Sequence, residues 1–284
     1  MNGNVIKFIN SDDPGDIDYS KYGIKDALLI DNTGISSDEK GLSIHLKNNE
    51  IKKVLLTAPV KEGLKNIVYG VNHDDIDDSD KIIGAASCTT NAIVPLLSAI
   101  DNEFKINNGH VETVHSYTND QNLIDNFHMK SRRGRAAALN MVITETGAAK
   151  AVAKVLPDLK GKLTANAIRV PTPNVSLAIL KLYLDKSSTL EDFNDFLKKT
   201  ANHSLLKDQI DISVSTENVS SDFVGSKYAG VIDGQSTIVN GKNAIVYVWY
   251  DNEIGYCAQL LKVIKKMSGI CLLYTSPSPR DPIG

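Results

Sequence analysis

Cys88 and His115 are the residues whose types and positions best support chemistry in this sequence. Cys88 lies between an apolar run, 82–86, that is typical of a buried strand and a segment, 92–100, with apolar positions at helical spacing. Backbone N–H groups and the helix dipole at such a junction favour the thiolate, which is the reactive form of cysteine. His115 follows a strand-like run, 109–114, and histidine is a base that a cysteine nucleophile can use. We therefore expect the two side chains to meet; the alternative is that Cys88 is a small buried hydrophobe.

Four motifs occur in order along the chain, at residues 86–91, 115–121, 169–173 and 249–253, and they read ASCTTN, HSYTNDQ, RVPTP and WYDNE. Together they closely resemble the phosphorylating glyceraldehyde-3-phosphate dehydrogenases, over roughly residues 4–269. The resemblance implies a cytoplasmic, homotetrameric enzyme of glycolysis that uses NAD, with NADP not excluded. Its implied reaction converts glyceraldehyde 3-phosphate and inorganic phosphate to 1,3-bisphosphoglycerate through a cysteine thioester.

The resemblance also implies roles for individual residues. Cys88 is the nucleophile, and His115 is the base, with a cationic His115 raising the thiolate fraction. Thr118 and Arg169 match the site for the substrate phosphate, where a planar guanidinium suits phosphate oxygens. The residues that match the site for the attacking phosphate are Ser87, Thr89, Arg135, Thr146 and Gly147. Those that match the cofactor site are Asn32, Thr33, Gly34, Thr57, Asn252, Glu253 and Tyr256.

Simpler interpretations of these residues stay open on the sequence alone. Each threonine is also explained as a helix cap or turn residue, and Asn32-Thr33-Gly34 as an ordinary turn. Residues 252–256 equally mark the start of a helix after a strand. The acidic run 73–80 lacks the glycine and glutamate of a calcium loop, so we predict a solvated loop and no metal site. The basic residues 130–135 lack interleaved aromatics and favour subunit and cofactor contacts over nucleic-acid binding.

Composition limits the class of protein. A chain of 284 residues that is 42% hydrophobic suits about two globular domains. The net charge of −3 argues against a nucleic-acid protein held by positive charge. Three cysteines form no disulfide framework and suit a reducing compartment. Neither an apolar run long enough to span a membrane nor a signal-peptide pattern is present, and we expect a cytoplasmic protein without a membrane partner.

The expected fold is α/β plus α+β. Residues 1–87 predict a partial Rossmann-type parallel sheet, with strands at 27–30 and 54–59 around a helix at 37–47 that Ser37 caps. Residues 88–251 predict a catalytic domain on a largely antiparallel sheet. Its predicted strands are 110–116, 164–170, 176–184, 219–223, 237–239 and 244–249. Its predicted helices are 146–156 and 190–200, the latter capped by Thr189.

Three further features complete this division. Pro95 either kinks the helix after Cys88 or delays its regular part to about Val94. A helix at 254–267, within the segment 252–269, is expected to return to the first domain. The proline-rich residues 270–284 depart from the family and are interpreted as a non-native tail.

No G-x-G pair occurs among the 19 glycines, although dinucleotide-binding dehydrogenases carry G-x-G-x-x-G on their first strand–helix turn. The expectation is an N-terminally incomplete copy that folds in part and does not turn over. The alternatives are erythrose-4-phosphate dehydrogenase, a Cys/His thiol hydrolase and a non-catalytic remnant.

Overall fold

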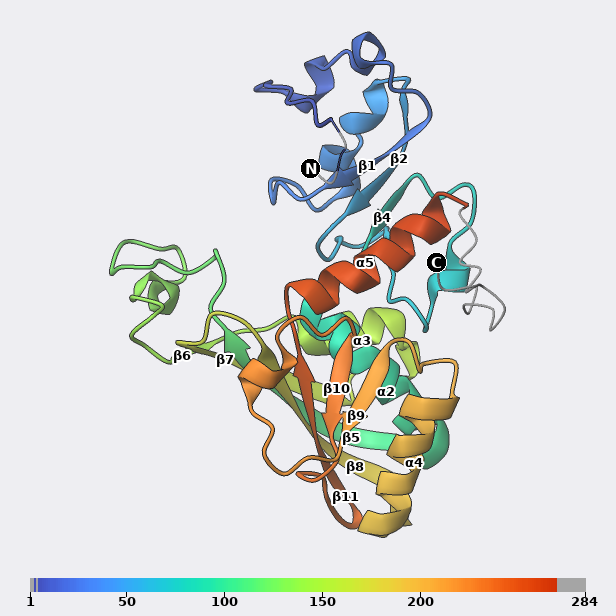
Figure 1. Ribbon diagram of the computed structural model, residues 1–284, viewed down its shortest axis with the longest axis vertical. Coiled ribbons are helices and arrows are strands. Elements are labelled where there is room, and N and C mark those ends of the chain that lie inside the picture. Colours follow the sequence, from blue (N-terminus) through green and yellow to red (C-terminus); the bar gives the residue numbers. More distant parts are fainter. Residues whose placement is uncertain (1–2, 4, 270–284) are drawn as a thin grey trace, which may run out of the picture.

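Two sheets, each in its own lobe, make up the molecule (Figure 1). The computed structural model describes residue 3 and residues 5–269. Residues 270–284, for which the sequence suggests a non-native tail, lie outside the described residues. The C-terminal helix α5 (Ile254–Met267) has the bounds that the sequence predicts and crosses between the lobes (Figure 1).

The smaller sheet consists of β1 (Ala27–Asp31), β2 (Ile51–Leu56), β3 (Lys65–Asn66) and β4 (Ile82–Gly84). It is parallel throughout, in the order β1-β2-β4-β3. Leu55 and Ile83 pack on one face against Val263 and Met267 of α5, while Leu56 packs on the other. A parallel sheet needs cover on both faces, and the two-residue period of the strands supplies apolar side chains to each. The predicted parallel unit is confirmed.

The helix predicted at 37–47 is wrong in extent and in its cap. The structure has a single turn, α1 (Glu39–Leu42), followed by a 3-10 helix at His45–Lys47. Asp38, and not Ser37, caps α1 by accepting a hydrogen bond from the N–H of Gly41 at 3.0 Å. Gly41 is a poor helix former, and the Ser43 hydroxyl donates to the Glu39 carbonyl at 2.6 Å, a local bond that competes with helix continuation.

The larger sheet consists of β5 (Ile106–Ser116), β6 (Val142–Thr144), β7 (Leu163–Val170), β8 (Ser176–Ser188), β9 (Ile210–Ser213), β10 (Gly230–Asp233) and β11 (Ile238–Tyr250). Its order is β6-β7-β5-β8-β11-β10-β9, and its pairs are antiparallel except β5 with β7 and β9 with β10. Helices α2 (Cys88–Phe104), α3 (Ala148–Val155) and α4 (Leu190–His203) share one core with it. The alternation along β8, which buries Leu180 and Leu182 and exposes Lys181, orients one face toward that core.

Several local predictions have clear outcomes. Thr189 caps α4, as predicted, by accepting from the N–H of Asp192 at 3.1 Å. Helix α2 begins at Cys88 and continues through the buried Pro95, so the later start near Val94 is wrong. The strand predicted at 219–223 is wrong, because Ser220–Phe223 forms a 3-10 helix. The two strands predicted at 237–239 and 244–249 are one continuous strand, β11.

Further short 3-10 helices lie at Pro14–Asp16, Tyr19–Tyr22, His73–Asp75, Ser131–Gly134 and Pro157–Leu159. Within the part of the chain that the structure describes, no helix has both the length and the apolar character needed to cross a membrane.

Candidate active site

Cys88 is the first residue of α2, four positions after the end of β4. The Ser87 hydroxyl caps this helix by accepting from the N–H of Thr90 at 3.1 Å. The Asn91 amide holds the turn before the helix by donating to the carbonyls of Ala85, at 2.9 Å, and Ser87, at 3.0 Å. These bonds fix the thiol at the helix N-terminus, where the sequence places it.

The backbone just before the nucleophile is also held from the opposite side. Ala86 has a φ of 55°, an unfavourable conformation for a residue with a Cβ. Its carbonyl accepts a hydrogen bond of 3.0 Å from the Tyr256 hydroxyl on α5. Helix α5 therefore contributes to the shape of the turn that presents Cys88.

His115 meets Cys88, with Nε2 lying 3.6 Å from Sγ. It is the penultimate residue of β5 and pairs in register with Arg169 on β7. Its Nδ1 lies 2.7 Å from the Ser116 carbonyl oxygen. The tautomer protonated at Nδ1 donates to that carbonyl and leaves the Nε2 lone pair facing the thiol, which is the arrangement of a general base. The tautomer protonated at Nε2 instead lets Nδ1 accept from Nη1 of Arg169 at 2.7 Å.

Burial controls the ionisation of this pair. Burial, with a smaller contribution from the nearby Arg169 cation, lowers the pKa of His115 to about 4. Burial also raises the pKa of the Cys88 thiol, although the Thr89 N–H and hydroxyl and the Arg169 cation oppose that rise. The cationic His115 expected from the sequence is therefore not supported, because burial disfavours the charged form of both partners. These shifts favour a thiol facing a neutral imidazole over the ion pair.

A cavity of about 440 Å³ lies over the pair, between the two lobes. Seven predicted site residues line it: Ser87, Cys88, Thr89, His115, Thr146, Gly147 and Arg169. The first lobe contributes Pro59, Glu62 and Asn66 to its wall. Residues far apart in the sequence thus share one pocket around the thiol.

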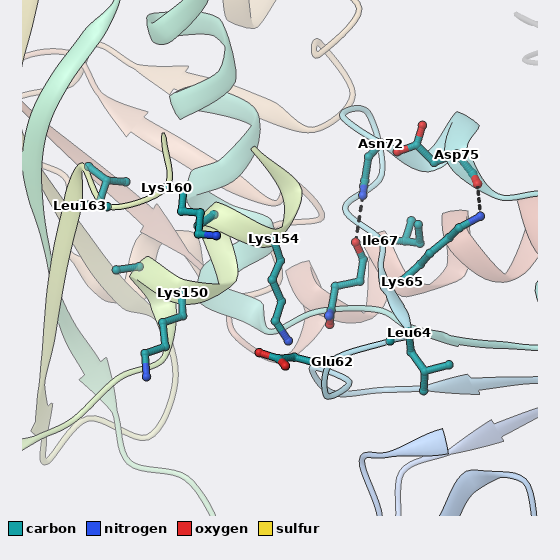
Figure 2. A pocket seen from close by; sticks show the side chains of 15 residues that line it. Glu62, Leu64, Lys65, Ile67, Asn72, Asp75, Lys150, Lys154, Lys160 and Leu163 are labelled. Carbon is teal, nitrogen blue, oxygen red and sulfur yellow. Dashed lines mark hydrogen bonds between the residues drawn. The ribbon is translucent and has the colours of Figure 1, made fainter. Parts of the chain in front are cut away.

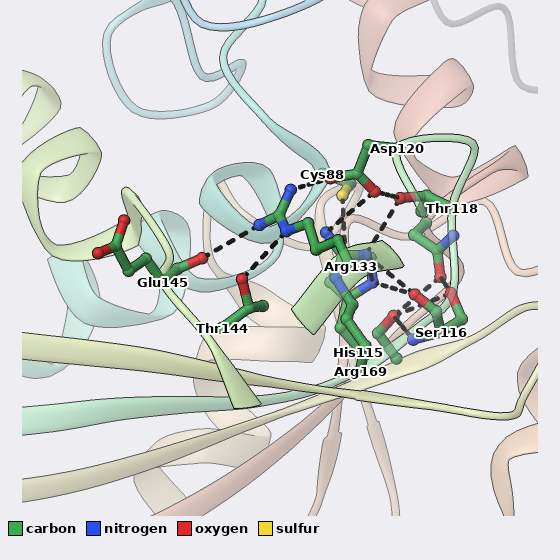
Figure 3. A network of polar contacts seen from close by, with 11 residues as sticks. Cys88, His115, Ser116, Thr118, Asp120, Arg133, Thr144, Glu145 and Arg169 are labelled. Carbon is green, nitrogen blue, oxygen red and sulfur yellow. Dashed lines mark hydrogen bonds and ion pairs between the residues drawn. The ribbon is translucent and has the colours of Figure 1, made fainter. Parts of the chain in front are cut away.

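Thr118 and Arg169, the predicted ligands of a substrate phosphate, lie beside one another. Nη1 of Arg169 is 3.3 Å from the Thr118 hydroxyl and 3.0 Å from the Ser116 carbonyl. Asp120 accepts a hydrogen bond of 2.5 Å from the Thr118 hydroxyl, and it also pairs with Arg133 (Figure 3). Sequence reasoning missed Arg133 and Asp120, although both lie within segments that it singled out.

The structure does not bring Arg135 to this pocket. Its guanidinium is mostly exposed and pairs with Asp125 at 3.1 Å. Arg133, two residues earlier, points inward instead and donates to the Thr144 hydroxyl at 3.0 Å (Figure 3). The 3-10 helix at Ser131–Gly134 turns the two side chains in different directions, and a linear cluster of basic residues gives no signal of that turn.

Two of the predicted attacking-phosphate residues, Thr146 and Gly147, lie at the start of α3. The Thr146 hydroxyl accepts from the N–H of Ala148 at 3.2 Å, and Gly147 is the exposed cap residue of the helix. The Thr89 hydroxyl lies 2.9 Å from the hydroxyl of the buried Tyr250. Thr146 thus has the turn role that the alternative interpretation gave it, whereas the Thr89 hydroxyl contacts a buried tyrosine; both residues also line the cavity.

The other predicted cofactor residues fall into two groups. Asn32, Thr33, Gly34 and Thr57 follow the carboxyl ends of β1 and β2, and none of them lines the cavity over Cys88. The buried Asp31 accepts from the N–H and hydroxyl of Thr33, at 2.8 Å each, and lies 3.1 Å from Nε2 of His45. This buried pair fixes the turn at 32–34.

Asn252, Glu253 and Tyr256 lie at the start of α5, on the side of the catalytic pair. Oδ1 of Asn252 accepts from the hydroxyls of Ser116, at 2.8 Å, and Ser176, at 2.9 Å. Its amide nitrogen has no hydrogen-bond partner among the described residues. Glu253 is exposed at the helix start.

A second cavity, of about 840 Å³, adjoins the first and shares Glu62, Asn66, Lys150 and Lys154 with it (Figure 2). Nζ of Lys154 on α3 donates to the Val60 carbonyl in the first lobe at 3.1 Å. Asn66 bonds the N–H and the carbonyl of the same residue, at 2.9 and 3.2 Å. Lys154 therefore links the helix at the predicted phosphate site to the loop after β2. Over the described ranges, no group of three or more acidic, histidine or cysteine side chains is arranged to hold a metal ion.

Together, a parallel sheet, a mixed sheet and a Cys–His pair between their lobes define a two-lobed protein of the α/β class with a thiol-based site. Comparison with known proteins identifies the family within this class. The family model described as glyceraldehyde 3-phosphate dehydrogenase, C-terminal domain, matches residues 87–252. The chain belongs to the glyceraldehyde-3-phosphate dehydrogenase family.

Individual relatives support this assignment. A glyceraldehyde-3-phosphate dehydrogenase-like protein of Pseudomonas aeruginosa is 62% identical over 269 residues, which cover 95% of this chain and 58% of the relative. Glyceraldehyde-3-phosphate dehydrogenase 2 of Trichormus variabilis is 42% identical, over 92% of this chain and 77% of the relative. Glyceraldehyde-3-phosphate dehydrogenase of Borreliella burgdorferi is 41% identical, over 94% and 81%. The chain thus spans little more than half the length of the Pseudomonas relative.

Proposed function

We propose that this protein oxidises glyceraldehyde 3-phosphate in the presence of inorganic phosphate, with NAD or NADP, to give 1,3-bisphosphoglycerate. The observation that carries the proposal is the 3.6 Å approach of His115 Nε2 to Cys88 Sγ in a cavity that Arg169 and the start of α3 also line. A nucleophile, a base and two groups of anion donors are the parts that this reaction needs. We propose a cytoplasmic location on the basis of that glycolytic role.

In the first step, the Cys88 thiol adds to the aldehyde carbon while neutral His115 takes the thiol proton. The imidazolium then returns this proton to the new oxyanion, which gives the thiohemiacetal and leaves His115 neutral again. In the second step, His115 in its neutral form accepts that hydroxyl proton as the carbon loses a hydride, which leaves a thioester on Cys88. General-base assistance of this kind contributes about 10²–10⁴ in rate.

Inorganic phosphate then attacks the thioester carbon, a C–O bond forms, and the C–S bond breaks to release the acyl phosphate and the Cys88 sulfur. The N-terminus of α3 presents backbone N–H groups to an anion at that position. Thr118 and Arg169 hold the phosphate that the substrate already carries, and this fixes the aldehyde carbon over the thiol.

A bound nicotinamide cofactor supplies the hydride acceptor. The Asn252 amide nitrogen and Tyr256, which contact the segments that carry His115 and Cys88, are proposed to position its nicotinamide end. The turn at 32–34 and Thr57 are proposed to face the rest of the cofactor. We assign residues 1–87 and 252–269 to this cofactor-binding part and 88–251 to the catalytic part.

The test measures reduced nicotinamide in two proteins side by side, the 284-residue chain and the same chain joined to a segment that carries G-x-G-x-x-G. The expected result is phosphate-dependent oxidation of glyceraldehyde 3-phosphate by the joined protein and little by the 284-residue chain. Faster oxidation of erythrose 4-phosphate would assign the alternative dehydrogenase. Hydrolysis of thiol-reactive esters without any oxidation in either protein would refute the proposal in favour of a hydrolase.

We also propose a homo-oligomer. Leu123, Ile124, Phe127, Met129 and Met141 are largely exposed on the segment 118–145, which projects from the second lobe (Figure 1). Exposed apolar side chains gathered on one segment are typical of a subunit contact. Sedimentation should show a tetramer, and Phe127→Asp should shift it toward smaller species, whereas a monomeric wild type contradicts the proposal.

A further inference from the structure

We propose that Asp120 is an internal counter-ion that occupies the substrate-phosphate subsite and is displaced when the phosphorylated substrate binds. The inference deepens the proposed function and rests on it for the identity of the ligand. The carboxylate lies among donors that are otherwise arranged for an anion.

Three cationic or hydroxyl groups converge on this carboxylate (Figure 3). Oδ1 accepts the Thr118 hydroxyl at 2.5 Å and lies 3.9 Å from Nη2 of Arg169. Oδ2 pairs with Nη1 of Arg133. A carboxylate offers two oxygens to guanidinium groups, as a phosphate does, so the same donors suit either anion. Asp120 is thus a stand-in for part of a phosphate group.

The contacts on the two sides of Asp120 differ in how firmly they are held. Arg133 is nearly buried and is also anchored to the Thr144 hydroxyl at 3.0 Å and the Glu145 carbonyl at 3.4 Å. Arg169 meets Asp120 only at 3.9 Å, and its buried Nε has no hydrogen-bond partner among the described residues. An entering phosphate can therefore take Thr118 and Arg169, while the carboxylate stays with Arg133.

This arrangement makes the subsite selective by charge. An incoming anion must bind Thr118 and Arg169 better than a carboxylate does, and it must tolerate a negative charge that remains nearby. A phosphate ester brings more negative charge and a third oxygen to these donors than a carboxylate does. The 42% exposed side chain of Asp120 has solvent beside it, so its displacement does not require repacking of the core.

The test uses glycerol 3-phosphate, a non-reactive analogue of the substrate, to protect Cys88 from iodoacetamide. Each rate is expressed relative to the same variant without the analogue, because a change at Asp120 also alters the field at His115. Asp120→Asn should lower the half-protecting concentration about tenfold, a value discounted for solvent screening. Asp120→Ala should act in the same direction, and thermal unfolding confirms that both variants fold.

Asp125→Asn is the matched control, because Asp125 is on the same segment and pairs with the outward-facing Arg135. Its half-protecting concentration should equal that of the wild type. An unchanged or higher concentration for Asp120→Asn, with the wild type protected, would overturn the inference alone and make Asp120 an organiser of the arginines. Absence of protection in every variant would overturn both the inference and the proposed phosphate subsite.

Discussion

Nη1 of Arg169 lies 2.7 Å from Nδ1 of His115, on the side of the imidazole ring that faces away from Cys88. The pair arises from the parallel register of β5 and β7, in which the two residues are direct neighbours. The same guanidinium also bonds the Ser116 carbonyl and the Thr118 hydroxyl. One cation thus contacts both the proposed base and the proposed phosphate subsite, and it helps to keep His115 neutral.

Arg169→Ala should impair use of the phosphorylated aldehyde in an active form of the protein. Loss of a charge-assisted phosphate contact predicts a fall in kcat/KM for that substrate of about 10- to 100-fold, with the KM for the cofactor almost unchanged. Arg135→Ala is the control, since Arg135 is exposed and does not line the cavity. Steady-state kinetics with each substrate varied in turn measure kcat/KM for the aldehyde and KM for the cofactor. If Arg169→Ala has the same kcat/KM for the aldehyde as the wild type, Arg169 is not part of the phosphate site.

His115 should make the protein less stable in mild acid. Its pKa is about 4 in the folded state, below the ordinary value of 6.5, so the folded state binds fewer protons between these limits. Stability that is present above about pH 6.5 is therefore lost as the pH falls toward 4.

Urea unfolding at pH 7 and pH 5 measures this effect. The wild type should lose about 2 kcal/mol more than His115→Asn over that interval, because the variant has no proton to take up. Equal losses of unfolding free energy in the two proteins between pH 7 and pH 5 would mean that His115 is not held neutral by burial.

Lys154 should stabilise the junction of the two lobes. Lys154→Met removes the hydrogen bond to the Val60 carbonyl, which keeps its bond from Asn66, so the expected loss of unfolding free energy is about 1 kcal/mol. Faster hydrogen exchange at residues 58–62 should accompany it. Lys150→Met, on the same helix and without a described hydrogen bond, should change neither quantity. Identical exchange in both variants contradicts this role.

Sequence patterns predicted the parts of the fold that depend on local periodicity. The bounds of α5, the Thr189 cap and the core-facing alternation of β8 all follow from side-chain spacing. The 3-10 turn at Ser220–Phe223 does not, because it depends on tertiary contacts, including the stacking of Phe223 on Trp249 with ring centroids 5.4 Å apart. The break after α1 likewise reflects the poor helix propensity of Gly41 and the bond from the Ser43 hydroxyl to the Glu39 carbonyl.

The predictions for the site likewise divide into those that the sequence motifs carry and those that depend on tertiary structure. The sequence motifs predicted that Cys88, His115 and Arg169 come together, and all three line one cavity. The choice between Arg133 and Arg135 needed the direction of each side chain, which spacing within a loop does not encode. The ionisation of His115 was predicted wrongly because burial, which opposes the imidazolium, depends on how the lobes close around the ring.

The most direct test of the central claim, that His115 acts as the base for Cys88, is the rate of Cys88 alkylation by iodoacetamide at pH 7, followed by peptide mass spectrometry. The exposed Cys257 is an internal reference in the same molecule. We predict that Cys88 reacts much faster than Cys257 and that His115→Asn slows Cys88 by about 100-fold or more without affecting Cys257. Equal rates at the two cysteines, or a Cys88 rate that survives His115→Asn, would contradict the account.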